Sequence, residues 1–170
     1  MPRQFGIKLP IITPDLCALV PTYSMAEPLV FSPPSLNSFG VDLVELVDVA
    51  RAMHDFGARY ERRLFRESER ARWPGVSVPE SRLKACALSF ATKEAAIKAL
   101  ELADGGVDWR DIEVQIQGLQ VNGLNLHGRA ADLAAQAGFV SWLVSSSISG
   151  DKALACVHAR RLASPVLGDH

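Results

Sequence analysis

The chain has 170 residues, of which 48% are apolar and 22% are charged, so it is long enough to bury one self-sufficient core. Its net charge of -1 gives no general reason to expect a nucleic acid or a membrane surface as partner, and a charged partner would have to be recognised by a local patch. No apolar run approaches the roughly 20 residues that cross a bilayer. The three cysteines form no C-x-x-C pair, so neither a zinc site nor a disulfide framework is expected, and a reducing cytoplasm fits.

Residues 1–37 contain seven of the ten prolines and show neither helical nor alternating periodicity. We interpret them as an irregular, Pro-rich N-terminal extension. Pro10, Pro14 and Asp15 interrupt its first apolar stretch, which argues against a signal peptide. One compact domain is expected over residues 38–162, followed by a C-terminal tail over 163–170.

The first half of this domain is expected to be mainly helical after one strand. Its expected elements are a strand over 39–44, a helix to about residue 56, a charged helix over 60–72 and a long helix over 81–102. Gly57 separates the first two helices, and Asp104-Gly105-Gly106 ends the long one.

The second half favours strands. Ile112, Val114 and Ile116 alternate with polar residues, and Asn122-Gly123 is a hairpin turn signal. The expected elements are strands over 112–117 and 124–126, a helix over 128–137, and strands over 139–147 and 153–159. This order predicts an α+β fold in which a mainly antiparallel sheet packs on the long central helix.

The long helix carries an acid where its core-facing side is expected. Advancing about 100° per residue, one stripe contains four apolar residues and one acid: Leu83, Ala87, Phe90, Glu94 and Ile97. A buried carboxylate needs a cation or it protonates, so Glu94 is a candidate metal ligand. Alternatively, Lys98 one turn further on forms an ordinary i,i+4 pair with it. Lys93 lies off the stripe, and we expect it to face solvent.

Asp42 is a second misplaced acid, because it interrupts an apolar strand in which aspartate is disfavoured. Glu45 follows at the start of the next helix, where the helix dipole alone accounts for an acid. Magnesium takes one or two protein carboxylates and fills its other positions with water and phosphate oxygens. Asp42 and Glu94 would suit such an ion if the fold brings them together, which their spacing in the sequence does not establish.

Four segments carry motifs in a recognisable order: Phe39-Gly40-Val41-Asp42-Leu43-Val44-Glu45, Arg63-Leu64-Phe65 with Glu69, Phe90-Ala91-Thr92-Lys93-Glu94-Ala95-Ala96-Ile97-Lys98-Ala99, and Asp111-Ile112-Glu113-Val114. The first resembles the G-[IV]-D-[IL]-V-E opening of the holo-[acyl-carrier-protein] synthase family, the small phosphopantetheinyl transferases. The third is similar to the family signature [FW]-A-[AT]-K-E-A-x-x-K-A. The other two match its R-x-[FL]-[ST]-x-x-E element and its D-I-E-V strand, and the resemblance covers about residues 39–159.

The resemblance implies the 4′-phosphopantetheinyl transferase fold and the transfer of 4′-phosphopantetheine from coenzyme A to a serine of an apo acyl or peptidyl carrier protein. It implies that Asp42 and Glu94 bind Mg²⁺ together with the coenzyme A pyrophosphate. Glu94 would also take the serine proton, directly or through a water, and Lys98 would offset charge on the leaving group. Lys93 and Lys98 would contact coenzyme A. Members of this class are typically homotrimers.

The chain departs from the family pattern at four positions. Ser89 stands where an arginine is usual, Glu101 where a G-T-G loop begins, Ile148 where a histidine is common, and Asp48 where the first helix carries an arginine that contacts the carrier. Ser89 and Ile148 replace groups that the resemblance assigns to the nucleotide end of coenzyme A, for which Arg82 or Lys84 could compensate. The alternative is a divergent member that no longer transfers from coenzyme A and serves as an interaction module or as an enzyme on a biosynthetic small molecule.

A run of arginines offers a surface for an acidic carrier protein. If residues 59–70 formed one helix, five arginines would share a face about 100° wide: Arg59, Arg62, Arg63, Arg66 and Arg70. The alternative is a solvated face balanced by Glu61, Glu67 and Glu69. The family pattern places a helix start near residue 66, which favours two helices over one.

Overall fold

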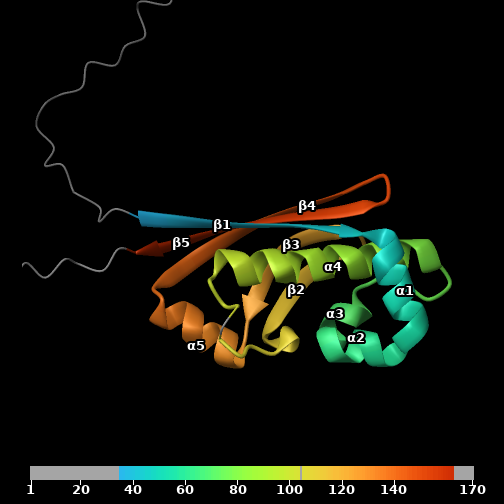
Figure 1. Cartoon of the computed structure of the whole chain (residues 1–170), viewed down its shortest axis with the longest axis horizontal. Coiled ribbons are helices and arrows are strands. Elements are labelled where there is room, and N and C mark those ends of the chain that lie inside the picture. The colour runs from blue at the N-terminus through green and yellow to red at the C-terminus, as the bar shows by residue number, and fades with distance from the viewer. Residues whose placement is uncertain (1–34, 104, 163–170) are drawn as a thin grey trace, which may run out of the picture. The chain divides into compact units, whose positions relative to one another are not determined.

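The structure, a computed structural model, describes residues 35–103 and 105–162, and it has the predicted α+β architecture (Figure 1). In chain order the elements are β1 (Ser35–Glu45), α1 (Leu46–Phe56), α2 (Ala58–Leu64), α3 (Glu67–Ala71), α4 (Pro79–Ala99), the 3₁₀ helix η2 (Trp109–Asp111), β2 (Ile112–Gln117), β3 (Gln120–Leu126), α5 (Gly128–Gln136), β4 (Phe139–Ser149) and β5 (Lys152–Leu162). No helix among the described residues is long and apolar enough to cross a membrane.

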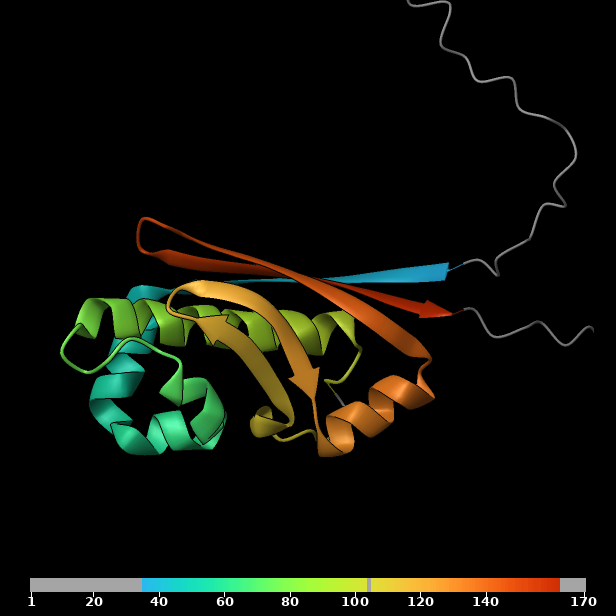
Figure 2. The same cartoon turned by 180° about the vertical axis from the view of Figure 1, so that it is seen from behind.

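Two antiparallel sheets surround the long helix α4. β1, β5 and β4 form a three-stranded sheet in that order, and β2 pairs with β3 in a hairpin. Figures 1 and 2 show α4 lying along the three-stranded sheet, with α1 to α3 near its N-terminal end and α5 near its C-terminal end. The expected mainly antiparallel sheet on a long helix is confirmed, and all the strand pairs are antiparallel.

The stripe predicted along α4 packs on the core, because Leu83, Phe90 and Ile97 are partly buried against its two clusters, but it is not the most buried side of the helix. Of its five members only Ala87 is fully buried, and Glu94 is half-buried. The fully buried positions instead run around most of the helix, among them Ala85, Leu88 and Ala95, because α4 contacts β1, β5, β2 and α1 on different sides. Small alanine side chains allow these close contacts.

The strand β1 approaches α4 at a glycine. Gly40 is buried, and a Cβ built on it would lie 1.9 Å from the carbonyl oxygen of Ala95 and 2.6 Å from the amide nitrogen of Ala99. Because side chains alternate along a strand, Asp42 and Val44 point to the same side of β1 as Gly40. The backbone contact at Gly40 therefore brings Asp42 close to the last two turns of α4.

The charged helix expected over 60–72 is two helices, as the family pattern favoured. Phe65 and Arg66 are extended and separate α2 from α3, and the Arg66 amide donates to Glu69 Oε2 at 2.7 Å, which caps α3. The expected hairpin turn at Asn122-Gly123 is also wrong. These two residues lie within β3 beside a bulge, and the turn falls instead at 118–119, where Gly118 has a φ of 62°.

Most of the expected N-terminal extension and all of the expected tail lie outside the described residues. The first strand begins at Ser35, so residues 35–37 of the expected extension belong to β1, and β5 ends at Leu162. The assignment of an N-terminal extension and of a tail over 163–170 remains a prediction.

Candidate functional site

One of the two misplaced acids of the sequence, Asp42, contacts a lysine where β1 crosses α4. Lys98 Nζ donates to Asp42 Oδ1 at 2.8 Å and to the carbonyl oxygen of Val41 at 3.1 Å. The Asp42 side chain is 16% exposed and that of Lys98 is 50% exposed. The lysine is therefore an accessible cation at the mouth of the site, while the aspartate lies deeper.

Glu94 lies one turn before Lys98 on α4, and its pKa is affected by the nearby charge of Asp42. Burial raises the pKa of Glu94 above its usual value, the negative charge of Asp42 raises it further, and Lys98 opposes both effects. The i,i+4 pair expected between Glu94 and Lys98 is not formed, because within the described residues Lys98 pairs with Asp42. The carboxylate of Glu94 is thus partly buried beside a second carboxylate without an ion-pair partner of its own in the described structure.

Such an arrangement fits a hard divalent cation. Two carboxylates whose charges repel each other are stabilised by a shared cation, and oxygen ligands are those that magnesium prefers. No group of three or more His, Cys, Asp or Glu side chains in residues 35–103 and 105–162 is placed to hold a metal. An ion at Asp42 and Glu94 would have to complete its coordination with water or with oxygens of a bound phosphate.

Lys93 is not at the surface, so that expectation is wrong. Its side chain is fully buried, and its ammonium donates to Glu69 Oε2 at 3.0 Å, to the Trp109 carbonyl at 2.9 Å and to the Ile112 carbonyl. It also lies 5.2 Å from the centre of the Phe65 ring. All three donors of Lys93 are used within the protein, which leaves none for coenzyme A in this conformation.

Glu69 completes this buried pair. Its Oε1 accepts the Val114 amide at 3.0 Å, and its Oε2 accepts both Lys93 and the Arg66 amide. Burial raises the pKa of Glu69 and lowers that of Lys93, and the attraction between them opposes both shifts. Through these bonds Glu69 links α3 to β2 and to Lys93 of α4, which is the residue before Glu94.

The other expected coenzyme A contacts are engaged with glutamates. Arg82 Nη2 donates to Glu61 Oε2 at 2.7 Å, and its side chain is 17% exposed. Lys84 pairs with Glu80 one turn earlier. Arg82 would have to break a partly buried ion pair to reach a phosphate, whereas the pair of Lys84 involves a largely exposed glutamate.

The positions that depart from the family pattern have partners of their own. Ser89 is buried, and its hydroxyl oxygen accepts the Trp73 indole N–H at 3.3 Å. Ile148 packs against the buried cluster that contains Leu88. Glu101 has a φ of 56° and lies 3.6 Å from Arg161, so a left-handed residue follows α4 without being glycine. Each of these three residues therefore makes contacts within the protein that differ from the roles implied by the family pattern.

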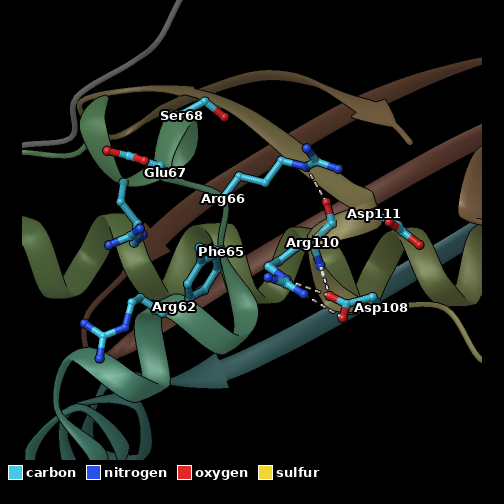
Figure 3. A pocket seen from close by; sticks show the side chains of 9 residues that line it. Arg62, Phe65, Arg66, Glu67, Ser68, Asp108, Arg110 and Asp111 are labelled. Atoms are coloured by element: carbon cyan, nitrogen blue, oxygen red, sulfur yellow. Dashed lines mark hydrogen bonds and ion pairs between the residues drawn. The ribbon is translucent and has the colours of Figure 1, made fainter. Parts of the chain in front are cut away.

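The five arginines do not share one helical face, because the chain breaks between α2 and α3. Arg59 and Arg63 line a mostly apolar pocket of about 450 Å³ with Phe56, Tyr60 and Leu64. Arg62, Arg66 and Arg70 line a second, polar pocket of about 580 Å³ (Figure 3). The structure thus divides the expected patch into two neighbouring surfaces.

Sequence reasoning missed a polar cluster around Glu113. The alternation along β2 predicts an outward-facing side chain, but Glu113 is 7% exposed. It accepts the Ser68 hydroxyl at 2.6 Å and lies 2.8 Å from His127 Nε2. Burial acts to raise the pKa of Glu113, and these two hydrogen bonds, with the nearby charges of His127 and Arg72, outweigh it and lower the pKa. No signal in the sequence pairs these residues.

Comparison with known proteins gives a consistent result over the same part of the chain. A sequence model of the 4′-phosphopantetheinyl transferase superfamily matches residues 38–157. The holo-[acyl-carrier-protein] synthase of Herpetosiphon aurantiacus is 37% identical over 127 residues, which cover 69% of this chain and 94% of that protein. The synthase of Paramagnetospirillum magneticum is 40% identical over 119 residues, covering 68% of this chain and 88% of that protein.

Solved structures agree in fold. A structure described as the Chronobacterium ammoniagenes ACPS-CoA complex has a TM-score of 0.61 and 29% sequence identity, and the match covers 75% of this chain and 99% of that one. The holo-ACP-synthase of Plasmodium yoelii, at 19% identity and the same TM-score of 0.61, shares the fold.

Proposed function

Because this chain belongs to the 4′-phosphopantetheinyl transferase superfamily, we propose that it transfers 4′-phosphopantetheine from coenzyme A to a serine of an apo acyl or peptidyl carrier protein. The grouping of Asp42, Glu94 and Lys98 where β1 crosses α4 carries this proposal. The named relatives are carrier-protein synthases, and one similar structure is a complex with coenzyme A, which supports the same donor here.

In this proposal Asp42 and Glu94 would hold Mg²⁺ at the site where the pyrophosphate of coenzyme A binds. The bound ion would neutralise phosphate charge and orient the donor. The serine oxygen forms a bond to the β-phosphorus while the bond from that phosphorus to the bridging oxygen breaks, so that adenosine 3′,5′-bisphosphate leaves. Glu94 receives the serine proton directly or through a water. Lys98, half exposed beside Asp42, stabilises negative charge on the leaving oxygen.

A second candidate is a relative that has lost coenzyme A transfer. It is favoured by the buried position of Ser89, by the packing of the partly buried Ile148 and by the ion pair that engages Arg82. Calorimetry with coenzyme A and Mg²⁺ separates the two candidates, because a non-transferase that has lost these contacts would not bind the donor tightly.

The carrier protein would dock on the arginines of α2 and the loop after it. Arg59 and Arg63 flank the exposed ring of Phe56, and Arg62 and Arg66 lie on the adjacent surface. An acidic carrier helix that inserts one apolar side chain beside Phe56 would be steered by these charges. At position 48 of α1 the family pattern has an arginine, whereas this chain has the exposed Asp48, which pairs with Arg51. This position therefore offers no positive charge to a carrier.

We also propose a homotrimer located in the cytoplasm. The outward face of the three-stranded sheet exposes Phe39, Val41, Leu43 and Leu143, an apolar surface of the kind that subunit contacts cover. Within the described residues Cys86 and Cys156 are free thiols, which is consistent with a reducing compartment.

Mass spectrometry of an apo carrier protein incubated with coenzyme A and Mg²⁺ tests the proposed activity. The wild-type chain is expected to add the mass of phosphopantetheine to the carrier, and Asp42→Asn is expected to abolish the addition. Asp132→Asn, an exposed acid on α5, is the matched control and should leave transfer unchanged. Absence of any mass gain with several apo carriers would overturn the proposal.

A further inference from the structure

The polar pocket between α2, α3 and η2 has a chemical composition of its own. It is lined by four arginines and three acids, together with Phe65 and Ser68: Arg62, Arg66, Arg70, Arg110, Glu67, Asp108 and Asp111. Its volume of about 580 Å³ lies within the range of small-molecule sites. The residues arise from two helices, the loop between them and a turn more than 35 positions away, so the fold, rather than one charged helix, builds the pocket.

One arginine and one acid of this pocket, Arg110 and Asp108, form an ion pair with each other. Arg110 donates to Asp108 from its backbone amide at 2.9 Å and from its side chain at 3.1 and 3.2 Å. Figure 3 shows this pair folded together at the edge of the pocket. The charge left to attract a ligand is therefore that of Arg62, Arg66 and Arg70, against Glu67 and Asp111.

The three remaining guanidinium groups have no carboxylate partner in the part of the chain that the structure describes. Arg66 Nε donates to the Arg110 carbonyl, which holds its guanidinium at the pocket and leaves both terminal nitrogens free of protein acceptors (Figure 3). The side chains of Arg62 and Arg70 make no hydrogen bond or ion pair to described residues, and Nε of Arg70 is buried without a partner. A buried guanidinium N–H without an acceptor is unfavourable, so an anion that enters the pocket gains more than it would at an exposed arginine.

From this geometry we infer that the pocket binds a phosphate group, at a site separate from that of Asp42, Glu94 and Lys98. Arg62, Arg66 and Arg70 line the pocket from α2, from α3 and from the loop between them. A planar guanidinium group can form paired hydrogen bonds to the oxygens of a phosphate. The pocket is larger than an inorganic phosphate needs, and Glu67 and Asp111 at its rim can accept hydrogen bonds from hydroxyl groups. A phosphate ester of a small hydroxylated molecule would use both features, and free phosphate would use only the arginines.

The two sites lie on different sides of α4. Asp42 reaches α4 from β1, whereas Phe65 contacts Lys93 from the loop between α2 and α3, and Glu69 contacts it from α3. The chemistry proposed for the first site requires a metal, because its two carboxylates repel phosphate. Metal-free conditions therefore isolate binding at the arginine pocket.

Calorimetric titration of the full chain in chloride buffer with a chelator tests this inference. We expect inorganic phosphate and ribose 5-phosphate to bind, the ester more tightly, and ribose not to bind. Equal binding of the two phosphates would identify free phosphate as the source. Arg66→Gln and Arg70→Gln should each weaken binding about tenfold or more, since each removes charged hydrogen bonds.

Two control variants locate the binding site. Arg51→Gln removes an exposed arginine of α1 that pairs with Asp48, and Lys98→Gln removes the cation beside Asp42. Both should bind ribose 5-phosphate as the wild type does, and circular dichroism should show all variants folded. Absence of binding by either phosphate, or binding that Lys98→Gln abolishes and the pocket variants leave unchanged, would overturn the inference. Because neither coenzyme A nor a carrier is present, the result is independent of the proposed transfer.

Discussion

Glu94 lies in surroundings that favour its neutral form. Its folded-state pKa is raised, mainly by burial and then by Asp42, so the folded chain binds a proton more tightly there than the unfolded chain does. The cost of the Glu94 charge to folding is therefore absent below the unfolded pKa, grows as pH rises from the unfolded to the folded pKa, and is fully present above the folded pKa. A bound cation would offset this cost, because its positive charge stabilises the ionised carboxylate.

Glu94→Gln should therefore stabilise the metal-free protein while abolishing transfer. The gain in melting temperature is expected to be larger at pH 8 than at pH 4, since only the ionised glutamate carries the cost. Thermal melts at the two pH values measure it. Glu80→Gln is the matched control on the same helix, because hydrogen bonding and the charge of Lys84 lower the pKa of Glu80 and its loss should bring no gain. A melting temperature at pH 8 that falls in Glu94→Gln would contradict this reading.

The buried pair of Lys93 and Glu69 should be costly to break from one side. Lys93→Met leaves Glu69 buried without its cation, a change typically worth about 3–5 kcal/mol. Urea denaturation of Lys93→Met should show a loss of this size, and the double variant with Glu69→Gln should recover part of it. Lys84→Met, which breaks a pair with a largely exposed glutamate on the same helix, should cost only about 0.5 kcal/mol. Equal losses of unfolding free energy in the two lysine variants would show that the buried pair contributes no more to stability than the exposed one.

At the scale of elements, the position of Asp42 depends on how closely β1 approaches α4. Gly40→Ala introduces a Cβ that would overlap the backbone of Ala95, so the strand must move outward. We expect a loss of about 1–3 kcal/mol in unfolding free energy, with transfer reduced because Asp42 moves with the strand. Gly75→Ala is the control, since its nearest neighbour is Ser77 Oγ at 3.6 Å. Unchanged stability in Gly40→Ala would mean that the contact relaxes without cost.

The order of elements was predictable because each strand and helix carries its own periodicity and end signals. Asp42 and Glu94 could be singled out because an acid in an apolar setting is visible in the sequence. The arrangement around α4 was not predictable, since alanines suit contact on any side and give no preferred face. Lys93, Glu113 and the turn at Gly118 depend on partners supplied by other elements, so local patterns placed them wrongly.

At the scale of the whole molecule, the sheet has one face that the described chain leaves uncovered. Leu143 is 72% exposed and Phe39 is 64% exposed, and they lie on either side of His158 of β5. If this face joins three subunits, Leu143→Glu should place a charge in each contact and produce monomers. Sedimentation velocity measures the change. Val76→Glu, in an exposed loop before α4, should leave the assembly intact. A wild-type protein that sediments as a monomer would rule out the trimer.

The pairing of Ser35 with Leu162 sets the first and last described residues side by side on adjacent antiparallel strands. A short linker between these two positions would close the chain without distorting the sheet, and new ends could be opened in the two-residue turn at Gly118-Leu119. Such a circular permutant would retain the crossing of β1 over α4. In the natural chain the hairpin of β2 and β3 is complete before the three-stranded sheet, whereas in the permutant the three-stranded sheet would be complete first. The permutant offers a direct way to learn whether folding of this chain begins from the long helix with its sheet or from the small hairpin.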